Sequence, residues 1–111
     1  MRFSVLICIA PQERETAVIE TCRQAGAGGV TILEGKGMGL QEKKTFLGLT
    51  FEAMESFLVF VLERSLATHV LKAIKKGHQD HTIAFIIPIE HLTGIDLNQV
   101  DRFVDQVKEE I

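Results

Sequence analysis

The chain has 111 residues, of which 46% are hydrophobic and 24% charged. This length and composition predict one domain over residues 1–111, with enough apolar content for a packed core. The formal net charge of −3 and the pI near 5.8 give no positive field that would attract phosphate backbones, so nucleic acid is not expected as a partner. The apolar runs are too short to cross a bilayer and Met1 begins no signal-peptide pattern, so we expect a cytoplasmic protein that is not membrane-embedded.

Three elements are predicted in the N-terminal third of the chain. Residues 3–10 are rich in β-branched and aromatic side chains and stop at Pro11, which predicts a strand. Apolar side chains recur at helical spacing over residues 12–25, and Gly26 supplies a stop, which predicts a helix. Residues 30–33 form a short β-branched run, which predicts a second strand.

A long connection and two further elements are predicted in the middle of the chain. Residues 40–56 combine weak periodicity with mixed charge, which predicts a long loop of the kind that usually carries function. Residues 57–62 (FLVFVL) give the strongest strand signal. Helical spacing resumes over residues 65–76, with Ser65 as the predicted cap and Gly77 as the stop.

A strand over residues 82–89 and an amphipathic helix over residues 97–111 complete the pattern. The order βαββαβ plus a helix predicts an α+β fold, a ferredoxin-like sandwich with four antiparallel strands and both early helices on one face. The strands at 57–62 and 82–89 are apolar without alternation, so both of their faces should be buried. Because two helices cover one face, we expect the last helix or a second copy of the chain to cover the other.

Two cysteines occur in the sequence. Cys8 lies inside an apolar run and Cys22 inside a helical pattern. In a reducing compartment this placement predicts two small buried hydrophobic side chains, in preference to a disulfide or a redox centre.

The segment Gly35-Lys36-Gly37-Met38-Gly39 has the clearest potential for ligand binding. Three glycines at alternate positions allow positive φ and leave backbone N–H groups open to an anion, and Lys36 adds a positive charge. A purely structural role, the exit from a strand into a loop, explains the glycines equally well. The spacing matches neither a Walker A loop nor a dinucleotide fingerprint, so neither a P-loop NTPase nor a Rossmann enzyme is expected.

The histidines offer an alternative site. His78 and His81, with Asp80 between them, are chemically competent metal ligands. Solvated loop histidines after a helix end are the simpler interpretation, because no cysteine pair or third known ligand accompanies them. The sequence also has no serine elbow, no catalytic cysteine motif and no distinctive carboxylate pair, so no enzyme and no catalytic residue are predicted.

The segment from Gly29 to Gln41, GVTILEGKGMGLQ, is similar to the "GxTVTEVKGFGRQ" segment of the PII nitrogen-regulatory signal-transduction proteins. The elements predicted after residue 56 are similar to the third strand and second helix of that family, and the resemblance extends from Met1 to about Ile95. The chain therefore resembles a divergent PII-like protein. This resemblance implies a ferredoxin-like homotrimer whose sheets face inward, with nucleotide sites between subunits and a partner-binding loop over residues 40–56.

The same resemblance implies which residues meet a ligand. Thr31 matches the family's threonine near the adenine, and Val61 lies where the third strand meets the base. Gly37, Gly39 and Gln41 match the turn that holds phosphates. The full implied set is Thr31, Lys36, Gly37, Met38, Gly39, Leu40, Gln41 and Val61. No cofactor is required and no metal is expected, and ADP, AMP or ATP would act as a regulatory ligand.

The chain also departs from the family pattern. Leu40 replaces an arginine, the basic residue entering the fourth strand is missing at His81-Thr82-Ile83, and two C-terminal arginines fall at about Gly94 and Asp96. Each missing charge-assisted bond is worth about 1.5–3 kcal/mol, so triphosphate binding as the family has it is not expected. The sequence contains no tyrosine, which excludes nucleotidylation of a loop tyrosine.

Three functions follow from these patterns. The first is a trimeric sensor of a mononucleotide or small anion that regulates a transporter or enzyme through residues 40–56. The alternative is a trimeric metal-binding protein that uses the loop histidines. The third is a small enzyme acting in a cleft between subunits, which needs no linear motif.

Overall fold

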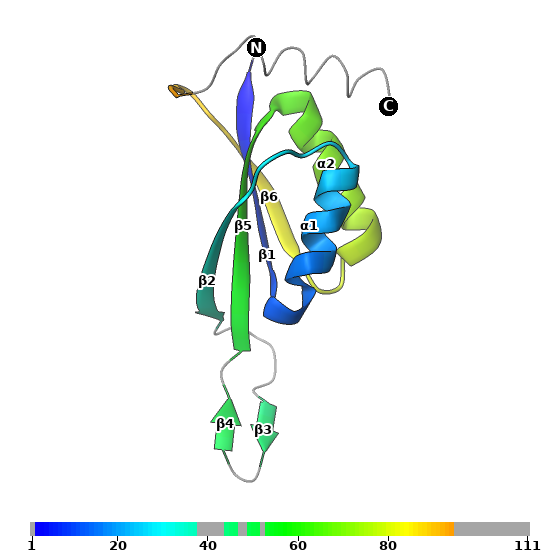
Figure 1. Cartoon of the computed structure of the whole chain (residues 1–111), viewed down its shortest axis with the longest axis vertical. Helices are drawn as coiled ribbons and strands as arrows, with labels where there is room; N and C mark the ends of the chain where they lie inside the picture. The colour runs from blue at the N-terminus through cyan, green and yellow to red at the C-terminus, as the bar shows by residue number, and fades with distance from the viewer. Residues whose placement is uncertain (1, 38–43, 47–48, 52, 95–111) are drawn as a thin grey trace.

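The computed structural model describes residues 2–37, 44–46, 49–51 and 53–94 (Figure 1). The elements in chain order are β1 (Phe3–Pro11), the 3-10 turn η1 (Gln12–Arg14), α1 (Glu15–Gln24), β2 (Thr31–Gly37), β3 (Lys44–Phe46), β4 (Leu49–Phe51), β5 (Ala53–Glu63), α2 (Arg64–His78) and β6 (Ile83–Pro88). The predicted helix over residues 97–111 lies outside the described residues. None of the described helices is long and apolar enough to span a membrane.

Four strands form one sheet in the order β2-β5-β1-β6, and each neighbouring pair is antiparallel. Helices α1 and α2 lie side by side on one face of this sheet (Figure 1). The predicted α+β, ferredoxin-like arrangement is therefore confirmed. Strands β3 and β4 form a separate two-stranded ladder, which extends beyond the end of β2 and β5 (Figure 1).

Strand β5 and the hairpin β3–β4 correct the predicted loop over residues 40–56. Strand β5 begins at Ala53, before the strand predicted at residue 57, and its first residues pair with the end of β2. Lys36 is paired with Met54, and Gly37 with Ala53. The sequence alone did not reveal this extension because the hydrogen-bonding partner of Ala53 is distant in the chain.

Helix α2 also differs from its prediction at both ends. The cap is Glu63 rather than Ser65, because the Glu63 carboxylate accepts hydrogen bonds from the backbone N–H groups of Ser65 (2.9 Å) and Leu66 (3.1 Å). Ser65 donates its hydroxyl to the same carboxylate. Gly77 is no stop, since the helix continues through it to His78.

The core lies between the helices and one face of the sheet. Its fully buried members come from both layers, including Leu6 and Cys8 from β1, Leu58 and Phe60 from β5, Val18 and Cys22 from α1, and Val70 and Ile74 from α2. The prediction that both cysteines are buried is confirmed, and both are free thiols. A hydrogen bond with Cys22, followed by burial, raises the pKa of the Cys8 thiol well above its usual range. Cys8 is therefore a neutral packing residue.

Neither α1 nor α2 lies on the opposite side of the sheet (Figure 1). We call this side the open face, and its members are Val5, Ile7, Ile9, Thr31, Leu33, Phe57, Val59, Val61, Ile83, Phe85 and Ile87. Val61 is 43%, Ile87 46% and Ile83 65% exposed. Within the described residues only one face of the sheet is covered, and the predicted cover of the other face, the helix over residues 97–111 or a second copy of the chain, stays a prediction.

Candidate functional site

Strand β2 carries the first three predicted ligand residues at an edge of the sheet. It pairs with β5 on one side only, within the described part of the chain. Thr31 starts the strand, and Lys36 and Gly37 end it. Because an edge strand has one unpaired side, its backbone groups there remain available to a ligand or to another chain.

Thr31 and Val61 form one half of the predicted site. Thr31 pairs with Val59 in the antiparallel ladder, so its side chain shares the open face with Val61, two residues further along β5. Diagonal neighbours of this kind lie about 7–8 Å apart. Both residues are exposed. A hydroxyl beside an exposed apolar surface suits a flat ring with polar edges, which needs contact area and one hydrogen bond.

The C-terminal end of β2, residues 35–37, forms the other half of the predicted site, and its backbone differs from the prediction. Gly35 and Gly37 continue β2 as extended strand, paired with Glu55 and Ala53. Among the described glycines, positive φ occurs only at Gly26 and Gly94. The proposed turn with positive φ is therefore wrong at Gly35 and Gly37. The remaining predicted residues, Met38, Gly39, Leu40 and Gln41, lie outside the described residues.

The two halves do not meet within one chain. Thr31 and Lys36 are five residues apart on one strand, which corresponds to about 16 Å. Because side chains alternate along a strand, Thr31 faces the open side and Lys36 the helix side. One copy of the chain therefore presents two separate surfaces.

A polar cluster that the sequence did not signal lies on the helix side near Lys36. The Gln12 side-chain amide donates to Glu34 Oε1 at 3.3 Å, and the Ser56 hydroxyl donates to Glu15 Oε1 at 2.7 Å. Ser56 is fully buried, in line with this bond. These contacts join η1 to β2 and the start of α1 to β5. They also place the Glu34 carboxylate on the same side of β2 as Lys36, which offsets the positive charge there.

His78 corrects the interpretation of the loop histidines. It is the last residue of α2, is 9% exposed, and has Nε2 2.7 Å from the hydroxyl of Thr21. That hydroxyl donates to the Ala17 carbonyl at 3.1 Å, so Nε2 is the donor toward Thr21. His78 therefore connects α1 to α2 and is neither a solvated loop residue nor an available ligand.

The predicted alternative, a metal site built from His78, His81 and Asp80, therefore loses His78 as a ligand. His81 and Asp80 remain exposed beyond the helix end. No group of three or more His, Cys, Asp or Glu side chains that could hold a metal ion is found among the residues that the structure describes.

The comparisons agree with the fold. The family model for nitrogen regulatory protein P-II matches residues 3–99. A PII-like signaling protein from Thermus thermophilus superposes with a TM-score of 0.63 at 18% identity, covering 80% of this chain and 88% of that chain. CPII from Thiomonas intermedia K12, a nitrogen regulatory PII-like protein bound to ADP, AMP and bicarbonate, superposes with a TM-score of 0.60 at 17% identity. The superposition covers 86% of this chain and 98% of that chain.

A third similar structure has another role in its name. The periplasmic divalent cation tolerance protein CutA from Archaeoglobus fulgidus superposes with a TM-score of 0.61 at 18% identity, covering 95% of this chain and 97% of that chain. At these identities the likeness concerns the fold, which different functions share. No curated protein matches the sequence.

Proposed function

Because the chain belongs to the P-II family of nitrogen regulatory signalling proteins, we propose that it binds a mononucleotide or small anion between copies of itself and regulates a partner. The partner is a transporter or an enzyme, contacted through residues 40–56. The protein acts in the cytoplasm, in the regulation of nitrogen use or transport. No catalytic step is part of this proposal.

The observation that carries the proposal is the separation of the two halves of the site. Thr31 and Val61 lie on the open face, whereas Lys36 lies on the helix side near the other end of β2. A ligand that needs both halves must take them from two chains. A neighbouring copy on the open face would cover its apolar side chains and bring a second chain beside Thr31, as in the homotrimer that the family resemblance implies.

The proposed ligand is ADP or AMP in preference to ATP. The nucleotide-bound CPII structure supports a mononucleotide. Leu40 and the other positions where this chain lacks the family's basic residues remove contacts to a third phosphate. Since each such charge-assisted contact is worth about 1.5–3 kcal/mol, ADP and AMP lose less than ATP.

The test is calorimetric titration of ADP, AMP and ATP into protein whose oligomeric state has been measured by light scattering. Thr31→Val should weaken ADP binding about two- to tenfold, because one net hydrogen bond is worth about 0.5–1.5 kcal/mol. Thr93→Val is the matched control, since Thr93 is exposed and lies outside the candidate site. Absence of binding by all three nucleotides in a confirmed oligomer would refute the nucleotide proposal.

The metal function is not proposed. His78 is buried against Thr21, and the remaining exposed pair, His81 and Asp80, is too small a ligand set to hold zinc in a structural site.

A further inference from the structure

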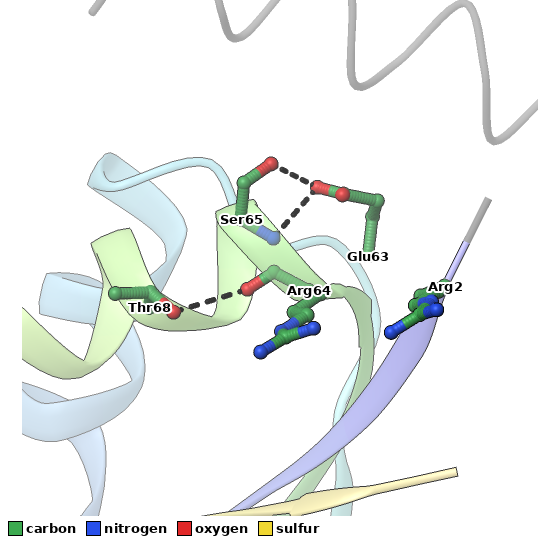
Figure 2. Close-up of a pocket in the computed structure, with 5 residues that line it drawn as sticks. All are labelled: Arg2, Glu63, Arg64, Ser65 and Thr68. Atoms are coloured by element: carbon green, nitrogen blue, oxygen red, sulfur yellow. Dashed lines mark hydrogen bonds between the residues drawn. The ribbon is translucent and has the colours of Figure 1, made fainter. Parts of the chain in front are cut away.

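A cavity of about 460 Å³ lies where β1 begins, β5 ends and α2 begins, lined by Arg2, Glu63, Arg64, Ser65 and Thr68 (Figure 2). The backbone holds this corner together, because the Arg64 N–H donates to the Arg2 carbonyl at 2.9 Å. Phe3 is paired with Glu63 at the same place. The corner is at the end of β5 opposite to Ala53, which pairs with Gly37. It is therefore distinct from the glycine end of the candidate nucleotide site.

Two arginines from distant parts of the sequence meet in this cavity. Figure 2 shows the guanidinium groups of Arg2 and Arg64 on the same side of the corner, Arg2 from the start of β1 and Arg64 from the first residue of α2. Neither side chain makes a hydrogen bond or an ion pair with any residue in the described part of the chain. Two like charges that line one cavity repel each other, and an anion between them relieves that repulsion.

The cation pair, and not the start of the helix, is the basis of this site. The first N–H groups of α2 are already satisfied, because the Glu63 carboxylate accepts from Ser65 and Leu66. Figure 2 shows this carboxylate directed toward Ser65 and away from the two guanidinium groups. Its negative charge is offset by the three hydrogen bonds that it accepts from Ser65 and Leu66.

We propose that the Arg2–Arg64 cavity binds the phosphoryl group of a small phosphorylated metabolite. Guanidinium groups present planar pairs of donors that match phosphate oxygens, and two of them can hold a doubly charged group from two sides. The cavity lies within the range of about 300–1,000 Å³ that is usual for small-molecule sites, which leaves room for an organic part beside the phosphate. Thr68 also lines this cavity, and its hydroxyl, which donates to the Arg64 carbonyl at 3.2 Å, can accept a hydrogen bond from such a part (Figure 2).

The experiment is calorimetric titration at low ionic strength with glycerol 3-phosphate as the probe, and with inorganic phosphate and glycerol as comparisons. Glycerol 3-phosphate should bind, and the double variant Arg2→Gln with Arg64→Gln should weaken it at least tenfold, because two charge-assisted bonds are lost. Arg64→Lys keeps the charge without the paired donors and should give an intermediate loss. Arg23→Gln removes an equal charge from the exposed end of α1 and should change the affinity less than twofold.

Four results would overturn the proposal. The first is no binding of glycerol 3-phosphate by the unmodified protein. The second is an equal loss in Arg23→Gln, which would mean a response to net charge alone. The third is equal affinity for inorganic phosphate, which would exclude recognition of a phosphorylated metabolite. The fourth is a parallel loss of ADP binding in the double variant, which would assign both arginines to the nucleotide site. The variants should keep the thermal midpoint within about 2 °C, since both side chains are exposed.

Discussion

The two faces of the sheet are built from the same strands but end in different environments. On the helix side, Leu58 and Phe60 of β5 are fully buried under α1 and α2. On the open face, Val61 of the same strand is 43% exposed and Phe85 of β6 is 39% exposed. The contrast shows that the described residues complete one core and leave a second apolar face, which the helix predicted over residues 97–111 or another copy of the chain would cover.

The largest expected effect is on the helix side. Phe60→Ala should lower the free energy of unfolding by about 3–5 kcal/mol, because it removes a fully buried ring and leaves a cavity. Urea denaturation followed by circular dichroism measures this loss. Phe85→Ala, on the open face, is the comparison. Measured at a protein concentration low enough to dissociate any oligomer, it should lower the free energy of unfolding by less than half as much as Phe60→Ala. Equal losses would show that the two faces do not differ.

The second effect is on assembly. Ile87→Asp places a charge among the open-face side chains and should raise the dissociation constant of the oligomer at least a hundredfold, because a carboxylate cannot be buried there without a partner. Light scattering across a concentration series measures this change. Ile32→Asp is a matched control, since Ile32 is 43% exposed but lies on the helix side of β2. If light scattering shows that the unmodified protein is a monomer, the proposal that a second copy covers the open face is contradicted.

The third effect depends on pH and concerns Cys8. Its pKa is raised in the folded protein, so above the ordinary thiol value, about 8.5, the unfolded chain loses a proton that the folded chain keeps. Above about pH 9 stability should therefore fall by about 1.4 kcal/mol per pH unit, because the unfolded chain has lost both thiol protons and the folded chain keeps that of Cys8; the same hydrogen bond lowers the pKa of Cys22, which acts in the opposite direction below that pH. Urea denaturation from pH 7 to 10 measures the slope. In Cys8→Ala the free energy of unfolding should change less with pH. An unchanged slope would mean that the Cys8 thiol does not cause the pH dependence.

The smallest effect is at the cap of α2, the helix that covers the buried face. Glu63→Ala should lower the free energy of unfolding by about 1 kcal/mol, because two backbone N–H groups lose their acceptor. Thermal denaturation measures this loss. Glu13→Ala is the control, since Glu13 is exposed in the turn before α1. The oligomeric state should stay the same, and dissociation would show that the cap also supports the open face.

Local patterns predicted most of the elements. The β-branched run ending at Pro11 became β1, and the helical spacing around Val18 and Val70 became α1 and α2. These features depend on side chains within one or two turns, so they are visible in the sequence. The glycine segment was harder, because Gly35 and Gly37 are held as strand by pairing with β5, about twenty residues away in the chain.

The candidate site was predictable in its parts but not in its arrangement. Thr31 and Val61 do share a face, whereas Lys36 lies on the other one, and this follows from the strand register. The Arg2–Arg64 cavity had no signal in the sequence, because its two arginines are 62 residues apart in the chain and reach the same end of the strand pair only when β1 pairs with β5.

The sequence by itself determined the order of the four sheet strands and of α1 and α2, the burial of Cys8 and Cys22, and the excess of apolar side chains over what two helices can cover, but not the β3–β4 hairpin. Periodicity and composition are local properties, and they are sufficient for these conclusions. The tertiary structure alone decided which side chains meet: the Glu63 cap, the contact between His78 and Thr21, and the separation of Lys36 from Thr31. The reason is that register and helix packing join residues far apart in the chain, and no local pattern specifies those pairs.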